Sequence, residues 1–103
     1  MYERSDKRYI YNLINEYLES KIDEVALCDG MYSSYVHEID ETTLNDTESQ
    51  AFSELETVTK RFSEFDSDHK LDPKAFTTKE EVKKAVIEAK KKLQENGLFY
   101  DNI

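Results

Sequence analysis

Carboxylates are the most numerous groups in this sequence that could do chemistry. The chain has 103 residues, with 23 Asp and Glu against 14 Lys and Arg, and a net charge of −9. Acid–base catalysis would need one carboxyl group in an apolar pocket that raises its pKa, and the spacing of so many acids singles out no such pair. The negative charge argues against direct binding to nucleic acid or to an anionic membrane. It favours a basic partner, or a role in solubility alone.

Two partial motifs for a metal site fail, and one cysteine stands alone. An EF-hand loop that began at Asp66 would need glycine and glutamate where the chain has Leu71 and Thr77. His37 opens a zinc-helix pattern that lacks its second histidine. Cys28 has no partner for a disulfide and is expected to be a small, partly buried apolar residue. We therefore expect no cofactor, no metal and no catalysis.

The elements that must position the acids are helices. Apolar residues recur every three or four positions in four segments, which predicts amphipathic helices over about 6–21, 23–39, 46–64 and 78–95. Capping residues mark their starts: Ser5 or Asp6, Asp23, Asn45 with Glu48 or Thr47 with Gln50, and Thr77 or Thr78. The predicted fold is all-α, a four-helix bundle in a single domain, residues 1–103.

The inward faces of these helices follow from the same spacing. The second helix is expected to bury Leu27, Met31, Tyr35, Val36 and Ile39, with Gly30 as a point where it bends or frays. Four tyrosines are expected to be exposed and available for a second contact: Tyr2, Tyr9, Tyr11 and Tyr100. The single cysteine, the absence of an apolar leader and the absence of eighteen consecutive apolar residues predict a soluble cytoplasmic protein.

The acidic excess is concentrated in one region. Residues 1–37 carry a net charge of −3, residues 38–72 one of −8, and residues 73–103 one of +2. One interpretation is a solvated helix with acidic loops on either side. The other is a surface that imitates a phosphate backbone and docks into the basic cleft of an enzyme that normally holds nucleic acid, with an association rate that salt lowers.

From about Tyr9 to Leu93 the chain resembles the colicin D type of immunity protein, a family that includes immunity partners of contact-dependent growth-inhibition toxins. The likeness lies in short segments in a shared order: Leu13, Tyr17-Leu18, Ser20-Lys21-Ile22, Glu54-Leu55, Arg61-Phe62, Glu64-Phe65-Asp66-Ser67-Asp68, Phe76, Thr77-Thr78-Lys79-Glu80-Glu81-Val82 and Lys91-Lys92-Leu93. The chain departs from the family pattern in a longer second loop and in the tail after Gly97.

The resemblance implies a four-helix bundle that binds the basic C-terminal nuclease domain of a toxin, often one that cleaves tRNA. Carboxylates would stand where RNA phosphates lie in the nuclease. Carried onto this sequence, the first candidates are Glu64, Asp66 and Asp68, and Glu54 and Glu56 on the outer face of the third helix come second. Two alternatives remain: an acidic DNA mimic that inhibits a DNA-binding protein, and a small helical adaptor whose acidity only keeps it soluble.

Overall fold

Capping side chains and apolar stripes produce four α-helices in the computed structural model, which describes residues 3–62, 71 and 76–98. They are α1 (Lys7–Leu18), α2 (Glu24–Met31), α3 (Asp46–Thr59) and α5 (Lys79–Glu95). The side chains of Asp6, Asp23, Asn45 and Thr78 each accept a backbone N–H from the first turn. Asn45 and Thr78 also form complete capping boxes. These contacts confirm one of the alternatives at each predicted start.

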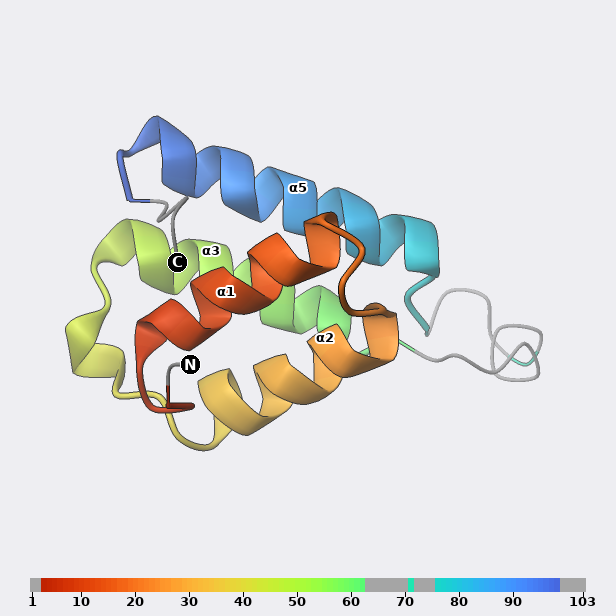
Figure 1. The fold of residues 1–103 in the computed structure, drawn as a ribbon, viewed down its shortest axis with the longest axis horizontal. Coiled ribbons are helices and arrows are strands. Elements are labelled where there is room, and N and C mark those ends of the chain that lie inside the picture. Colours follow the sequence, from red (N-terminus) through yellow and green to blue (C-terminus); the bar gives the residue numbers. More distant parts are fainter. Residues whose placement is uncertain (1–2, 63–70, 72–75, 99–103) are drawn as a thin grey trace.

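The four helices form the predicted all-α bundle. α3 and α5 make the most extensive helix pair, and α1 lies across α3 between α5 and α2 (Figure 1). The core is built from apolar side chains of all four helices: Ile10, Tyr11, Leu13, Ile14, Tyr17, Leu27, Met31, Ala51, Phe52, Leu55, Val82, Val86, Ala89 and Leu93. None of the helices that the structure describes has both the length and the apolarity needed to cross a membrane.

Tyr11 was expected at the surface, and that expectation is wrong. Its side chain is fully buried, and its ring packs edge-on against Phe52 of α3 with 5.5 Å between the ring centroids. The phenol oxygen donates a hydrogen bond within the core, which makes burial of its hydroxyl group tolerable. Tyr9 is half-buried, while Tyr2 and Tyr100 lie outside the described residues.

The predicted second helix changes its winding halfway. Its α-helical part ends at Met31 and continues as η1 (Tyr32–Val36), a π-helical turn. The wider turn rotates later residues away from a stripe spaced for an α-helix, so Val36 is 46% exposed and not part of the core as predicted. Gly30 lies within the α-helical part, so the helix is not frayed there, and a Cβ at Gly30 would lie 2.7 Å from Cδ1 of Leu13, so glycine allows α2 to approach α1 closely.

The third helix is shorter than predicted. It ends at Thr59 and not near residue 64, because the chain turns and the carbonyl of Arg61 accepts a hydrogen bond from the Thr77 N–H at 2.8 Å. Phe62 and Thr77 form an isolated parallel bridge. This contact holds the end of α3 next to the start of α5. Between η1 and α3, a short 3-10 turn, η2 (Glu41–Thr43), is capped by Asp40.

Candidate anionic interface

The three acids predicted to be the principal contacts, Glu64, Asp66 and Asp68, lie outside the described residues. The structure does describe where their segment leaves and rejoins the bundle. Arg61 and Thr77 lie side by side through their backbone hydrogen bond, so both ends of the segment are attached at the same end of the α3–α5 pair. The assignment of these three acids stays a prediction.

Glu54 and Glu56 are described, and the structure does not bring them together. Residues two apart in an α-helix point about 200° away from each other. Glu54 lies on the flank of α3 that faces α5, where its carboxylate pairs with Lys92 Nζ at 2.9 Å. Glu56 is half-buried on the opposite flank, close enough to Tyr35 of η1 to affect its pKa. The two do not form one outer face.

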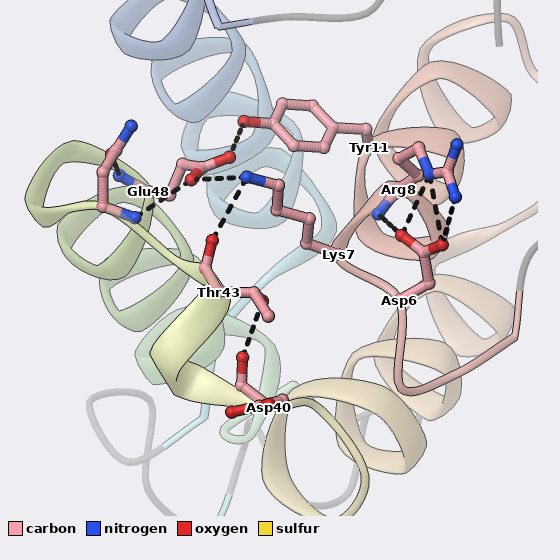
Figure 2. A network of polar contacts seen from close by, with 8 residues as sticks. Asp6, Lys7, Arg8, Tyr11, Asp40, Thr43 and Glu48 are labelled. Carbon is pink, nitrogen blue, oxygen red and sulfur yellow. Dashed lines mark hydrogen bonds and ion pairs between the residues drawn. The ribbon is translucent and has the colours of Figure 1, made fainter.

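Glu48 is an acid of the region 38–72 that adds nothing to the surface charge. Its side chain is 1% exposed, and Figure 2 shows that Lys7 and Tyr11 reach it from α1. Tyr11 Oη donates to Oε2 at 2.6 Å, and Lys7 Nζ donates to Oε1 at 3.1 Å. The Asn45 N–H donates to the same Oε1 at 3.0 Å, which completes the capping box. Glu48 therefore links α1 to the start of α3.

This link also orients the preceding turn. Lys7 Nζ donates a second hydrogen bond, at 3.2 Å, to the carbonyl of Thr43 in η2 (Figure 2). Burial alone would raise the pKa of Glu48, but the hydrogen bonds from Tyr11, Asn45 and Lys7, together with the charge of Lys7, hold it below its usual value. The capping pattern predicted the partner of Asn45. Nothing in the local sequence signalled the contacts with α1.

The acidic excess is most concentrated in the stretch that forms α2, η1, η2 and α3. Residues 22–59 contain ten acids and no Lys or Arg: Asp23, Glu24, Asp29, Glu38, Asp40, Glu41, Asp46, Glu48, Glu54 and Glu56. Cations reach this half of the bundle from other segments and pair with three of the acids: Lys7 with Glu48, Arg4 with Glu38, and Lys92 with Glu54. This stretch begins before residue 38, so the predicted acidic region 38–72 leaves out Asp23, Glu24 and Asp29.

Glu24 accepts a hydrogen bond from Tyr17, and the other acids of α2, η2 and α3 form no further ion pair with the residues that the structure describes. Asp29, Glu41 and Asp46 are exposed, and Glu56 is half-buried. Glu41 and Glu56 come from different elements and both raise the pKa of Tyr35, an effect added to the larger one of burial and opposed by a hydrogen bond with Ser53. Their combined field favours a cation on this side of the bundle. Asp29, Glu41, Asp46 and Glu56 are therefore called the unpaired acids, and Glu41 and Glu56 are the two that act on a common neighbour, Tyr35.

Neither the cysteine nor the hollow at the α1–α2 turn forms a reactive site. Burial, with added repulsion from Asp29, raises the pKa of the Cys28 thiol to about 12, so the nucleophilic thiolate is scarce near neutral pH. The hollow, of about 370 Å³, is lined by both signs of charge, among them Lys21, Lys83 and Asp23. No group of three or more potential metal ligands occurs within residues 3–62, 71 and 76–98.

The chain is a small all-α domain in which α2, η2 and α3 carry exposed or half-buried acids that form no ion pair with the described residues. Comparisons of the chain with models of protein families, with curated proteins and with solved structures found no match. The resemblance to the colicin D type of immunity protein therefore stays a prediction.

Proposed function

We propose that this protein is an immunity protein that binds the nuclease domain of a bacterial toxin, a tRNA-cleaving one, and neutralises it by covering its basic active site. The observation that supports this most directly is the stretch 22–59, in which ten acids occur without a Lys or Arg. Four of those acids, Asp29, Glu41, Asp46 and Glu56, are exposed or half-buried and form no ion pair with a residue that the structure describes. The protein acts by binding alone.

The chemistry of the partner explains why carboxylates would inhibit it. A nuclease must place Lys, Arg or protonated His around the scissile phosphate to stabilise the transition state. Carboxylates satisfy those cations through charge-assisted hydrogen bonds and offer no bond to cleave. Glu64, Asp66 and Asp68 are the proposed contacts within the active site, with Glu54 and Glu56 as secondary contacts. The Arg61–Thr77 hydrogen bond supports this arrangement, since it attaches both ends of that acidic segment to the bundle.

The first test is co-purification of the chain with the products of its own operon, followed by mass spectrometry. We expect a basic nuclease domain encoded next to this gene. Its association with the immunity protein should slow at least about tenfold between about 50 and 500 mM NaCl, because long-range attraction between opposite charges is screened by salt. A rate that is independent of salt would contradict the proposal and favour the adaptor. Capture of a DNA-binding protein would favour the DNA mimic.

The second test reverses charges in matched pairs. Asp66→Lys with Asp68→Lys should abolish neutralisation of the nuclease, because each removed contact between charged groups costs about 2–5 kcal/mol. The control variant, Glu88→Lys with Glu95→Lys, makes the same change in net charge at exposed positions of α5. It should neutralise the nuclease nearly as well as the natural chain. Equal effects of the two variants would show that net charge matters and that the acidic segment does not.

A further inference from the structure

The outer side of the second helical unit is unusually apolar for a surface. From Glu24 to Val36, α2 and η1 contain only two charged residues, Glu24 and Asp29, and both are acidic. By contrast, ten of the seventeen residues of α5 are charged. A helix at the surface of a soluble domain normally opposes an apolar side to a charged one. The outer side of α2 and η1 therefore has few of the charged residues that a surface helix normally presents to solvent.

Two large side chains are exposed on this outer side. Tyr32 is 57% exposed and Val36, four residues later on the π-helical turn, is 46% exposed. Asp29 precedes Tyr32 by three positions and is exposed, and Val25, half-buried, lies one turn earlier. We call Val25, Asp29, Tyr32 and Val36 the outer ridge. The ring of Tyr32 is held by an edge-on contact with His37, with 4.5 Å between the ring centroids.

The charges around the outer ridge decide what kind of surface fits it. Asp29 lies on the ridge, and Glu38 and Glu41 follow within five residues of Val36. Arg4 approaches Glu38 at 3.8 Å, and this ion pair partly neutralises both groups. A second copy of this chain, with its net charge of −9, would place acid against acid. A cationic surface would instead find the carboxylate of Asp29 about one turn from the exposed ring of Tyr32, and both groups bind a guanidinium.

We propose that the outer ridge is the docking surface for an arginine-rich face of a partner protein, with Tyr32 and Val36 at the centre of the contact. The partner is the basic domain of the proposed function, so this inference rests on that function for the partner's identity. Tyrosine and arginine are enriched at the energetic centres of interfaces. π-helical turns such as η1 occur frequently at functional sites. The outer ridge is formed by residues distinct from Glu54, Glu56, Glu64, Asp66 and Asp68.

The test is a titration of the full chain, followed by its backbone amide NMR signals, with the peptide Arg-Leu-Arg-Gly-Arg-Leu-Arg. We expect the largest shifts at residues 25–38. Tyr32→Ser with Val36→Ser should weaken binding about tenfold, the effect of removing roughly one buried apolar side chain. The matched control is Ile87→Ser, since Ile87 is 48% exposed on α5, where lysines surround it in sequence. It should bind the peptide like the natural chain.

A second peptide separates the apolar contact from the charge. Replacement of both leucines by serine should also weaken binding to the natural chain about tenfold, and should have little effect on the Tyr32→Ser, Val36→Ser variant. No binding, shifts confined to other elements, or equal binding by the ridge and control variants would overturn the inference. If the ridge variant still neutralises the nuclease, the ridge is not the docking surface and the proposed function stands. If the natural chain binds no nuclease while the ridge still binds the peptide, the function fails and the cationic docking surface stands.

Discussion

Removal of the Glu48 carboxylate should destabilise the protein more than removal of any exposed acid. Glu48→Ala leaves the buried Tyr11 hydroxyl without its acceptor, which costs about 1–3 kcal/mol. It also removes one half of the capping box at Asn45, worth about 1 kcal/mol. Lys7 is 27% exposed, so its ammonium group is solvated by water once Glu48 is removed, and the loss of this ion pair adds little to the cost of Glu48→Ala. We expect a loss of about 3 kcal/mol in the free energy of unfolding, measured by urea denaturation followed by circular dichroism.

Two further variants separate charge from shape at this site. Glu48→Gln keeps an acceptor for Tyr11 and should cost about 2 kcal/mol, the typical contribution of a hydrogen bond to a charged group. Lys7→Met leaves the carboxylate buried without a cation and should cost about 3 kcal/mol or more. The double variant should be less destabilised than the sum of the two, because the substitutions remove the same ion pair. Additive effects would refute the coupling.

The control is Glu54→Gln, which breaks an ion pair of similar length in a different environment. Glu54 is 60% exposed and lies 2.9 Å from Lys92, against 3.1 Å for Glu48 and Lys7. Exposed pairs contribute about 0–1 kcal/mol, so this variant should unfold within about 0.5 kcal/mol of the natural chain. Equal losses for Glu48→Gln and Glu54→Gln would refute the argument that burial determines the cost.

Glu48→Gln should also change how the free energy of unfolding depends on pH. The pKa of Glu48 is held below its usual value of 4.5 in the folded chain, so the unfolded chain takes up the proton first as pH falls. The contribution of Glu48 to stability is therefore complete above about pH 5 and disappears as pH falls through the folded-state pKa. The pKa values of Asp6 and Asp40 are also lowered, and these two groups contribute equally to the pH dependence of stability in the natural chain and in the Glu48→Gln variant. Glu48→Gln should thus lose less stability between about pH 5 and pH 3.

Two further substitutions test the second helix. Gly30→Val should destabilise the chain by about 2 kcal/mol or more, because the Cβ of valine would overlap Leu13. The control, Ala26→Val, lies at an exposed position of the same helix and should cost under about 1 kcal/mol. Equal losses of stability in thermal melts would refute the close approach of α2 to α1. Cys28, whose thiol pKa is raised to about 12, should react with iodoacetamide at pH 8 far more slowly than an unfolded control in urea, and comparable rates would contradict its burial.

Local sequence patterns were sufficient to predict the features that depend only on residues close together in the sequence. Caps at Asp6, Asp23, Asn45 and Thr78 were predicted because each needs only an acceptor placed two or three residues before a free N–H. The positive φ of 68° at Gly97, just after α5, follows from the same local rule for helix ends. Apolar residues three or four positions apart predicted α1, α3 and α5, and most of their buried residues keep that spacing because a helix repeats every 3.6 residues.

Long-range contacts decided what the patterns missed. Val36 was predicted to be buried, but a π-helical turn cannot be read from apolar spacing based on 3.6 residues. The third helix was predicted to reach residue 64, but it ends at Thr59, where Arg61 hydrogen-bonds to Thr77, sixteen positions away. For the candidate site, the sequence predicted an acidic surface. Helical spacing alone separates Glu54 and Glu56 on α3, but the pairing of Glu54 with Lys92 depends on how α3 packs against α5.

The sequence alone determined that the chain is all-helical, where most helices begin, and that acids far outnumber bases between residues 22 and 59, because these properties depend on residue types and short spacings. Only the tertiary structure decided which acids are available to a partner. A carboxylate such as Glu48 loses its surface role when residues some forty positions away, Lys7 and Tyr11, meet it in the core. Charge adds along a chain, but exposure depends on which helices pack together, and that packing decides which acids stay unpaired at the surface.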